Sequence, residues 1–517
     1  MLGNVMGMGV FINLYYLPGA SALYPGADLP LTVFIALGMT LLIATVYWFL
    51  STSMPRTGGD YVYVSRIFHP AIGFMTNLMF VVIVTTWVGF FPPLVASQGI
   101  ATMLSNLAIS TGSSSYLSAV PWLTSQIGEF IVGAIIIAIA IGVVLLPVKW
   151  VFRVLVGIFV TEIAIMVWFA AVLGTVSHST FVNNFNLHFG LANAYNTIIQ
   201  EGTKLGGVST YSITAGATTI GIVFTMLSFI GYANSSYFAG EMKGNPRSAQ
   251  GIAMMISPLL FAVIIFLQYQ LSYNVFGHDF LVAAGTLSTS TNPAVASAWS
   301  TYSAVQANPA YLISFVTSNP VFLVAVPLGL SLTMLGFAIV YMFIPIRQLF
   351  AYAFDRIIPT RLASVDRRGV PWAAVLLFGF IAYVSLYLAI YTQVFTYLGY
   401  TNFGWWIAAA IVMFAGAAFP YVSRTKEIFN NAPSIVRSKV LGVPVITVVG
   451  IVAGCLSLFV SYSAVLPSFT GGALNPLYVV DILLVFVVAL IIYAISHFYH
   501  KKEGMPLEMA MRELPPT

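Results

Sequence analysis

Side chains capable of covalent or metal chemistry are few in this chain of 517 residues, which holds 14 Asp and Glu, six His and one cysteine, Cys455. A single cysteine allows neither a disulfide within the chain nor a cluster of thiolate ligands. The two closest histidines, His497 and His500, lie near the C-terminal end, and we predict no metal site. An intramembrane enzyme would need converging nucleophiles, acid–base pairs or a metal. We therefore expect neither catalysis nor a cofactor.

One acidic residue, Glu162, lies deep inside an apolar run. It follows Arg153 by nine residues, which is roughly 14 Å along a helix. That depth is near the middle of a hydrocarbon core about 30 Å thick. By contrast, Glu129, Glu241 and Asp481 lie near the ends of apolar runs.

A charged carboxylate at the centre of a bilayer costs about 2.5–3.5 kcal/mol, so Glu162 should face the protein interior. We interpret Glu162 as a coupling residue that gains and loses a proton as the protein changes conformation. Two alternatives are a permanently neutral glutamate, hydrogen-bonded to the first or the eighth apolar run, and a sodium ligand.

The elements that hold these residues must lie in a membrane. The chain is 59% hydrophobic and 6% charged, against about 25% charged in soluble domains, and its mean hydropathy is +0.95. A run of roughly 20 apolar residues crosses a bilayer, and only helices satisfy their own backbone there. The runs predict twelve spanning helices, near 2–19, 30–51, 71–104, 128–147, 150–175, 215–239, 249–276, 320–349, 372–392, 395–419, 442–466 and 475–498.

The basic residues support this division of the chain. With twelve spans, every Lys and Arg except Lys204 falls on one side, in the connections after the even-numbered spans and in the tail. Such a bias is typical of the cytoplasmic side. We predict a multi-pass protein of the cell membrane with both termini in the cytoplasm. The net charge of +5 then needs no nucleic acid as a partner.

The two longest outer connections, 177–214 and 277–319, are polar without being strongly charged. The second holds 310–316, which is expected either as a short helix over the outer mouth or as a solvated loop.

Two spans contain residues that interrupt helices. Gly3–Phe11 holds three glycines at the start of span 1, and Ser228–Ser236 lies inside span 6. Interrupted helices at corresponding positions of two halves indicate the binding site of a transporter, although small residues can also serve close helix packing. Pro92 and Pro93 predict a kink in span 3.

Four segments resemble the amino acid–polyamine–organocation superfamily of permeases. Gly3–Phe11 is similar to its glycine-rich first helix, and Pro55–Tyr63 (PRTGGDYVY) to its Pro-x-x-Gly-Gly-x-Tyr-x-Tyr segment. Phe229–Gly231, followed by Glu241–Arg247, resembles the helix 6 motif. Arg347–Pro371 resembles the basic loop after helix 8. The N-terminal stretch looks most similar to arginine–agmatine antiporters.

The resemblance implies an all-α, LeuT-like fold in which two inverted repeats of five helices are followed by two peripheral helices. Residues 1–419 would form the transporter core, 442–500 the peripheral helices and 501–517 a cytoplasmic tail. It further implies an amino acid near the midplane, its carboxylate on amides around Met8 and Gly9 and its ammonium on carbonyls near Leu227 and Ile230. The implied binding residues are Gly7, Met8, Gly9, Leu227, Phe229, Ile230, Gly231 and Tyr232, the last either in contact with the substrate or merely packed.

Two positions depart from the family pattern. Ala233 and Phe49 stand where many relatives carry acids, so the pocket lacks an obvious carboxylate for a cationic side chain. We therefore expect proton-coupled symport or exchange of neutral, apolar or aromatic amino acids. The alternatives are a carrier of polyamines or nucleobases, an amino acid/amine antiporter, sodium coupling and a channel. The resemblance allows a homodimer.

The first half-helix is short. Six residues precede Gly7, about 9 Å of helix, whereas half a bilayer needs roughly 15 Å. We expect either a start about a dozen residues too late or an unusually short inner gate. No basic segment precedes the apolar run, so a signal peptide is not expected. A primary pump is not expected either, because no phosphate-binding Gly-x-x-x-x-Gly-Lys-Ser/Thr segment occurs.

Overall fold

The computed structural model describes residues 1–207, 212–241, 246–367, 369–392, 398–470 and 476–503. Within them, nine helices are long and apolar enough to cross a membrane. The apolar runs become helices because lipid offers no partner to the backbone. The nine are α3 (Leu29–Ser53), α5 (Pro70–Phe90), α8 (Gln126–Val144), α9 (Val148–Thr175), α13 (Pro246–Phe276), α17 (Pro320–Phe354), α18 (Trp372–Tyr391), α21 (Val445–Ser463) and α23 (Pro476–Lys502).

Three further crossings complete the predicted twelve in the described part of the chain. One is α19 (Leu398–Ala418), and the other two are interrupted. Span 1 consists of α1 (Leu2–Met8) and α2 (Ile12–Leu23), and span 6 of α12 (Ala215–Ser228) and the 3-10 helix η3 (Asn234–Glu241). The all-α polytopic fold and the interruptions in helices 1 and 6 are therefore confirmed.

Span 3 is more than kinked. The predicted continuous run 71–104 is wrong, because α5 ends at Phe90 and a π-helical turn, η1 (Val95–Ile100), leads into α6 (Ala101–Thr111). The cause is the pair Pro92 and Pro93, neither of which has an N–H to donate to the preceding turn.

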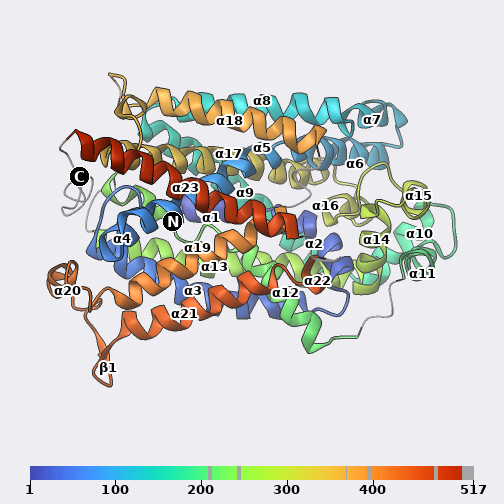
Figure 1. The fold of residues 1–517 in the computed structure, drawn as a ribbon. Helices are drawn as coiled ribbons and strands as arrows, with labels where there is room; N and C mark the ends of the chain where they lie inside the picture. Colours follow the sequence, from blue (N-terminus) through green and yellow to red (C-terminus); the bar gives the residue numbers. More distant parts are fainter. Residues whose placement is uncertain (208–211, 242–245, 368, 393–397, 471–475, 504–517) are drawn as a thin grey trace.

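The two ends of the helix bundle differ in charge. At one end lie α4 (Asp60–Ile67), α20 (Lys426–Asn431) and the hairpin of β1 (Lys439–Val440) and β2 (Val443–Pro444) (Figure 1). These elements carry Arg66, Lys426 and Lys439, and we name this the basic end. Lys204 lies in α11 (Ala194–Gly206), at the opposite end. Lys243 and Arg512 lie outside the described residues.

The long connections at the opposite end are largely helical. They form α10 (His178–His188), α11, α14 (His278–Thr289), α15 (Pro293–Ser300), α16 (Pro309–Leu312) and the 3-10 helix η4 (Ile313–Phe315). Residues 310–316 are thus helical as far as Phe315 and mostly buried, and the expectation of a solvated loop is wrong. A Cβ on Gly285 of α14 would lie 2.1 Å from the carbonyl oxygen of Pro18, so α14 packs directly on α2.

The remaining short elements are connections. They are η2 (Ser114–Ala119) and α7 (Val120–Leu123) before α8, η5 (Thr360–Ala363) after α17, and α22 (Pro467–Thr470) after α21. The tail predicted from residue 501 lies outside the described residues from residue 504 onwards.

Candidate functional site

The break in helix 1 is held by side chains from two other helices, α13 and α17. Gly9, which directly follows α1, has φ of 79°, a conformation that only glycine adopts without strain. The amide of Phe11 donates to the Thr333 hydroxyl at 3.2 Å, and Gln268 Nε2 donates to the carbonyl of Val10 at 2.7 Å. Backbone groups freed by the break are therefore satisfied inside the protein, as non-helical backbone at membrane depth requires.

The break in helix 6 lies against the first break, backbone to backbone. Gly231 has φ of 125°, and a Cβ on it would lie 2.8 Å from the carbonyl carbon of Gly7 and 2.9 Å from the amide nitrogen of Met8. The hydroxyl of Tyr341, on α17, donates to the carbonyl of Gly7 at 2.7 Å and lies 3.4 Å from that of Ile230. Tyr341 thus joins both breaks.

A cavity of about 270 Å³ adjoins the two breaks. No charged side chain is among the described residues that line it, and its polar side chains are those of Asn13, Tyr16 and Ser228. Asn13 Oδ1 accepts from Ser228 Oγ at 2.6 Å and from the Tyr269 hydroxyl at 3.2 Å. The other lining residues are Gly7, Met8, Ile12, Trp87, Phe90, Phe91, Phe224, Leu227, Ile230 and Phe337.

Aromatic rings form much of this cavity's wall. Trp87 packs against Phe337 and Tyr341 with ring centroids 6.0 and 5.6 Å apart, and Phe91 packs against Phe337 at 4.8 Å. These rings come from α5, the turn after it and α17. Ala233 and Phe49, which stand where many relatives carry acids, predict a pocket without an acid. They do not predict which residues of α5 and α17 line it.

Half of the predicted binding residues line the cavity. Gly7, Met8, Leu227 and Ile230 do so, whereas the other four lie behind that layer. Gly9 and Gly231 shape the turns. Phe229 is buried against Phe261, their rings meeting edge to face at 5.4 Å, and Tyr232 is buried against Tyr47 at 5.7 Å.

The cavity is closed toward the basic end. Asn4 Nδ2 donates to the carbonyl of Tyr232 at 2.6 Å, and Asn4 Oδ1 accepts from the amide of Ser235 at 2.7 Å. Asn234 Nδ2 donates to the carbonyl of Gly3 at 3.1 Å. These bonds fasten α1 to η3, whereas Tyr16, one turn beyond the break, is 37% exposed. The cavity therefore opens away from the basic end.

Glu162 lies in α9 and is fully buried. Its Oε1 accepts from the Thr333 hydroxyl at 2.5 Å, and its Oε2 has no hydrogen-bond partner among the described residues. Thr333 Oγ1 already accepts from the amide of Phe11, so its one hydrogen is directed to Glu162. A continuous chain of hydrogen bonds thus links Glu162, through Thr333 of α17, to the break in helix 1. The expected interior position of Glu162 is confirmed.

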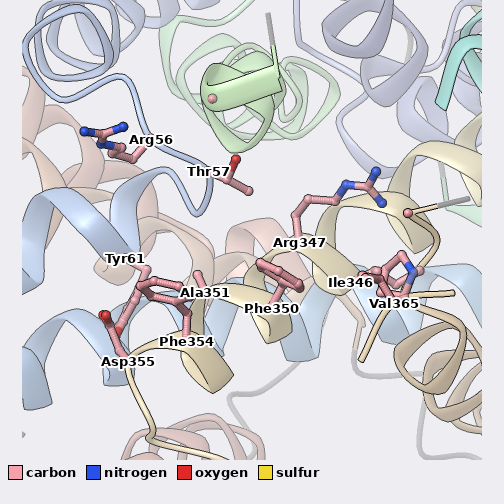
Figure 2. Close-up of a pocket in the computed structure, with 13 residues that line it drawn as sticks. Arg56, Thr57, Tyr61, Ile346, Arg347, Phe350, Ala351, Phe354, Asp355 and Val365 are labelled. Atoms are coloured by element: carbon pink, nitrogen blue, oxygen red, sulfur yellow. The ribbon is translucent and has the colours of Figure 1, made fainter. Parts of the chain in front are cut away.

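A separate cavity of about 410 Å³ lies at the basic end (Figure 2). Arg66 and the Tyr61 hydroxyl both bind Asp355 beside it, at 3.0 and 2.5 Å. Its two arginines, Arg56 and Arg347, point away from each other, and the guanidinium of Arg347 stacks on the ring of Phe343 at 3.4 Å. They do not converge on one ligand, so we assign this cavity no binding role.

A second buried carboxylate, Asp60, lies at the first residue of α4 and is 0% exposed. It accepts from Asn77 Nδ2 at 3.0 Å. Burial raises the pKa of Asp60 from 3.8 to about 6, against the opposing effect of hydrogen bonds from Asn77 and Tyr237.

We expect the stability of the protein to fall as the pH rises from about 4 to about 6 and to level off above that. In this window the folded protein binds more protons at Asp60 than the unfolded chain does, because the folded pKa is the higher one. The difference corresponds to about 3 kcal/mol. Asp60→Asn should remove this part of the pH dependence and raise the melting temperature at pH 8. Melting curves in detergent at pH 5 and pH 8 test this, with Glu427→Gln on α20 as the control. An Asp60→Asn protein that melts lower than the wild type at pH 8 would contradict the expectation.

Comparison with known protein families gives a match. The sequence model of a family described as amino acid permease matches residues 1–489. The match includes both breaks, every residue lining the cavity beside them, and Glu162. A search of curated proteins finds no match.

Proposed function

The chain belongs to the amino acid permease family, and on that premise we propose that it carries neutral, apolar or aromatic amino acids across the cell membrane by alternating access. Membership in the family and the many apolar helices make it a multi-pass membrane transporter of amino acids. We name the cavity beside the two breaks the central pocket. The proposal of neutral substrates depends on its lining, which holds no charged side chain among the described residues.

The observation that carries the proposal is the combination of two helix ends with an uncharged wall. The start of α2 and the end of α12 both border the central pocket, through Ile12 and Leu227. A helix is electropositive at its N-terminal end and electronegative at its C-terminal end. The two ends therefore suit the carboxylate and the ammonium of one amino acid.

The structure changes the expected detail of the carboxylate contact. The amide of Gly9 donates to the carbonyl of Val5 at 3.2 Å, within the last turn of α1. We propose that the carboxylate instead approaches the first turn of α2, because the N-terminal end of a helix is electropositive and the amide of Ile12 makes only a long bond, 3.4 Å, to the carbonyl of Gly9. Asn13 Nδ2 has no hydrogen-bond partner among the described residues and offers a further donor there.

The side chain of the amino acid would lie against Trp87, Phe91 and Phe337. An arginine or a polyamine would bury a cation there without a carboxylate to pair with, which is costly. This disfavours the alternative of a polyamine carrier or an arginine antiporter. A nucleobase would leave the two helix ends without charges to bind.

Ligand-induced stabilisation tests the proposal directly. Phenylalanine should raise the melting temperature of the purified protein. Phenylalaninamide, which lacks the carboxylate, and 3-phenylpropionate, which lacks the ammonium, should not. Arginine, putrescine and uracil should also have no effect. Stabilisation by arginine or putrescine but not by phenylalanine would refute the neutral pocket, and equal stabilisation by 3-phenylpropionate would refute the role of the helix ends.

Tyr341→Phe should weaken the binding of the amino acid about tenfold, because a buried carbonyl that loses its partner costs about 1–3 kcal/mol. The hydroxyl of Tyr341 holds the carbonyl of Gly7 beside the pocket. The control is Tyr383→Phe, which removes a hydroxyl that donates to the carbonyl of Ala134 at 3.1 Å, between α18 and α8. Titration of the melting temperature with phenylalanine gives both affinities. Equal affinity in the two variants would show that Tyr341 does not position the breaks.

We further propose that Glu162 couples transport to protons. The hydrogen-bond chain from Glu162 through Thr333 to Phe11 supports this, because a change in the proton on Glu162 would alter a contact of the helix 1 break. A permanently neutral glutamate, hydrogen-bonded to Thr333 of α17, would have the same geometry. Transport by Glu162→Gln distinguishes the two roles, as argued in the Discussion.

The arrangement of the chain in the membrane is also a proposal. We place the basic end and both termini in the cytoplasm, because cytoplasmic loops carry the excess of Lys and Arg. On this placement the central pocket opens to the outside. We assign residues 1–419 to the transporter core and α21 and α23 to the periphery. In support, only 17% of the residues in the apolar stretch of α23 are buried.

A further inference from the structure

The lipid-facing helix α23 ends beside a basic loop, and the two enclose a groove of about 880 Å³. We name it the α17–α23 groove. One wall is the loop after α17, residues 356–361, and the other is the last turns of α23 from Ile492 to Glu503. Figure 1 shows the C-terminal end of α23, whose last turns line the groove, at the basic end of the bundle.

The groove is a fixed feature rather than a chance gap. Arg356 has φ of 60°, unusual for a residue with a side chain. Its carbonyl accepts from Ser496 Oγ at 3.0 Å and lies 3.0 Å from His500 Nε2. The preceding residue, Asp355, is bound to Arg66. The loop is therefore fastened both to α23 and to α4.

Polarity changes along the groove over three turns of α23. Ile492 and Ile495 line its apolar part, and Ile495 is 66% exposed. Tyr499 lies four residues after Ile495, about 6 Å further along the helix. Tyr499 and His500 line the polar part. An exposed apolar strip that leads into polar groups matches the boundary between acyl chains and headgroups.

The charge of the polar part favours an anion. Arg356 and Arg361 line the groove, and Lys501 and Lys502 follow directly on α23. The acid lining this part is Glu503, whose Oε2 lies 3.3 Å from His500 Nδ1. Basic pockets beside spanning helices on the cytoplasmic side suit anionic lipid headgroups.

We propose that the α17–α23 groove binds an anionic phospholipid, with its phosphate between Arg356 and Arg361 and an acyl chain along Ile492 and Ile495. A zwitterionic lipid would match the apolar strip but not the charge. A soluble phosphate would match the charge but not the strip. The site is separate from the central pocket, so it does not depend on which amino acid is carried.

Native mass spectrometry of the full chain in detergent tests this with phosphatidylglycerol and phosphatidylcholine of identical acyl chains. The wild type should bind phosphatidylglycerol at least about tenfold more tightly. The double variant Arg356→Gln/Arg361→Gln should lose this preference. The control variant Arg424→Gln/Arg437→Gln, which removes two exposed arginines near α20 at the same end, should keep it.

Three results would overturn the proposal. One is an equal preference for phosphatidylglycerol in the two double variants, which would attribute that preference to general surface charge. Another is displacement of the lipid by equimolar glycerol 3-phosphate, which would indicate a site for soluble phosphates. The third is the loss of a dimer, rather than of bound lipid, in Arg356→Gln/Arg361→Gln, which would assign the groove to a second copy of the chain. A cooperative melting transition like that of the wild type shows that each variant is folded.

Discussion

Gly231→Ala should abolish the binding of amino acids, with a loss of at least about a hundredfold in affinity. Gly231 has φ of 125°, and a methyl group there would lie 2.8 Å from the carbonyl carbon of Gly7. Backbone atoms cannot move aside as a side chain can, so the two breaks would have to separate. Strain of about 1–3 kcal/mol from the dihedral angle adds to this clash. Titration of the melting temperature with phenylalanine measures the loss.

The matched control for this change is Gly216→Ala. Gly216 lies in the first turn of α12, in the same span 6, and a Cβ there would meet nothing within 4 Å. It should bind phenylalanine as the wild type does. Gly9→Val, at the other break, should resemble Gly231→Ala because Gly9 also has a positive φ of 79°. Near-normal affinity in Gly231→Ala would mean that the contact between the breaks does not shape the site.

Glu162→Gln should lose accumulation driven by a pH gradient, by at least about tenfold, while exchange of substrate for substrate stays within about twofold of the wild type. Glutamine keeps the size of the side chain and can still accept from the Thr333 hydroxyl, but it cannot exchange a proton. Because a buried ionisable group in a membrane is costly, its presence points to a role in coupling. Uptake into proteoliposomes with and without an imposed pH gradient separates the two activities.

The control for Glu162→Gln is Glu427→Gln, which changes an exposed acid of α20 and should leave both activities intact. Unchanged pH-driven accumulation in Glu162→Gln would make Glu162 a structural residue, neutral and hydrogen-bonded to Thr333 of α17. If accumulation instead follows sodium and is lost in Glu162→Gln, the carboxylate is a sodium ligand and proton coupling is wrong.

The spanning helices could be predicted because lipid imposes a length on them. Runs such as those that form α3 and α9 have to be helical, and the basic residues confirm how many runs there are. The breaks were also predictable, since glycines at membrane depth are recognisable in Gly3–Phe11. The third helix was mispredicted after Phe90, because hydropathy alone continues through Pro92 and Pro93.

The aromatic wall of the central pocket could not be predicted. Almost every residue in the second half of α17 is buried, so hydrophobic periodicity does not reveal which face carries Phe337 and Tyr341. The depth of Glu162 followed from its distance to Arg153, but its partner Thr333 depends on how α9 and α17 pack. Similarly, the polar sequence of 277–319 gave no sign that α14 would pack on Pro18.

Counterflow in proteoliposomes tests the central claim, transport of neutral amino acids, most directly. Vesicles that contain the purified protein are loaded with unlabelled phenylalanine, leucine, arginine, putrescine or uracil and diluted into a trace of labelled phenylalanine. We predict transient uptake of label above the equilibrium level only in vesicles loaded with phenylalanine or leucine, and none without protein. Uptake that is driven by arginine, putrescine or uracil, and not by the neutral amino acids, would contradict the account.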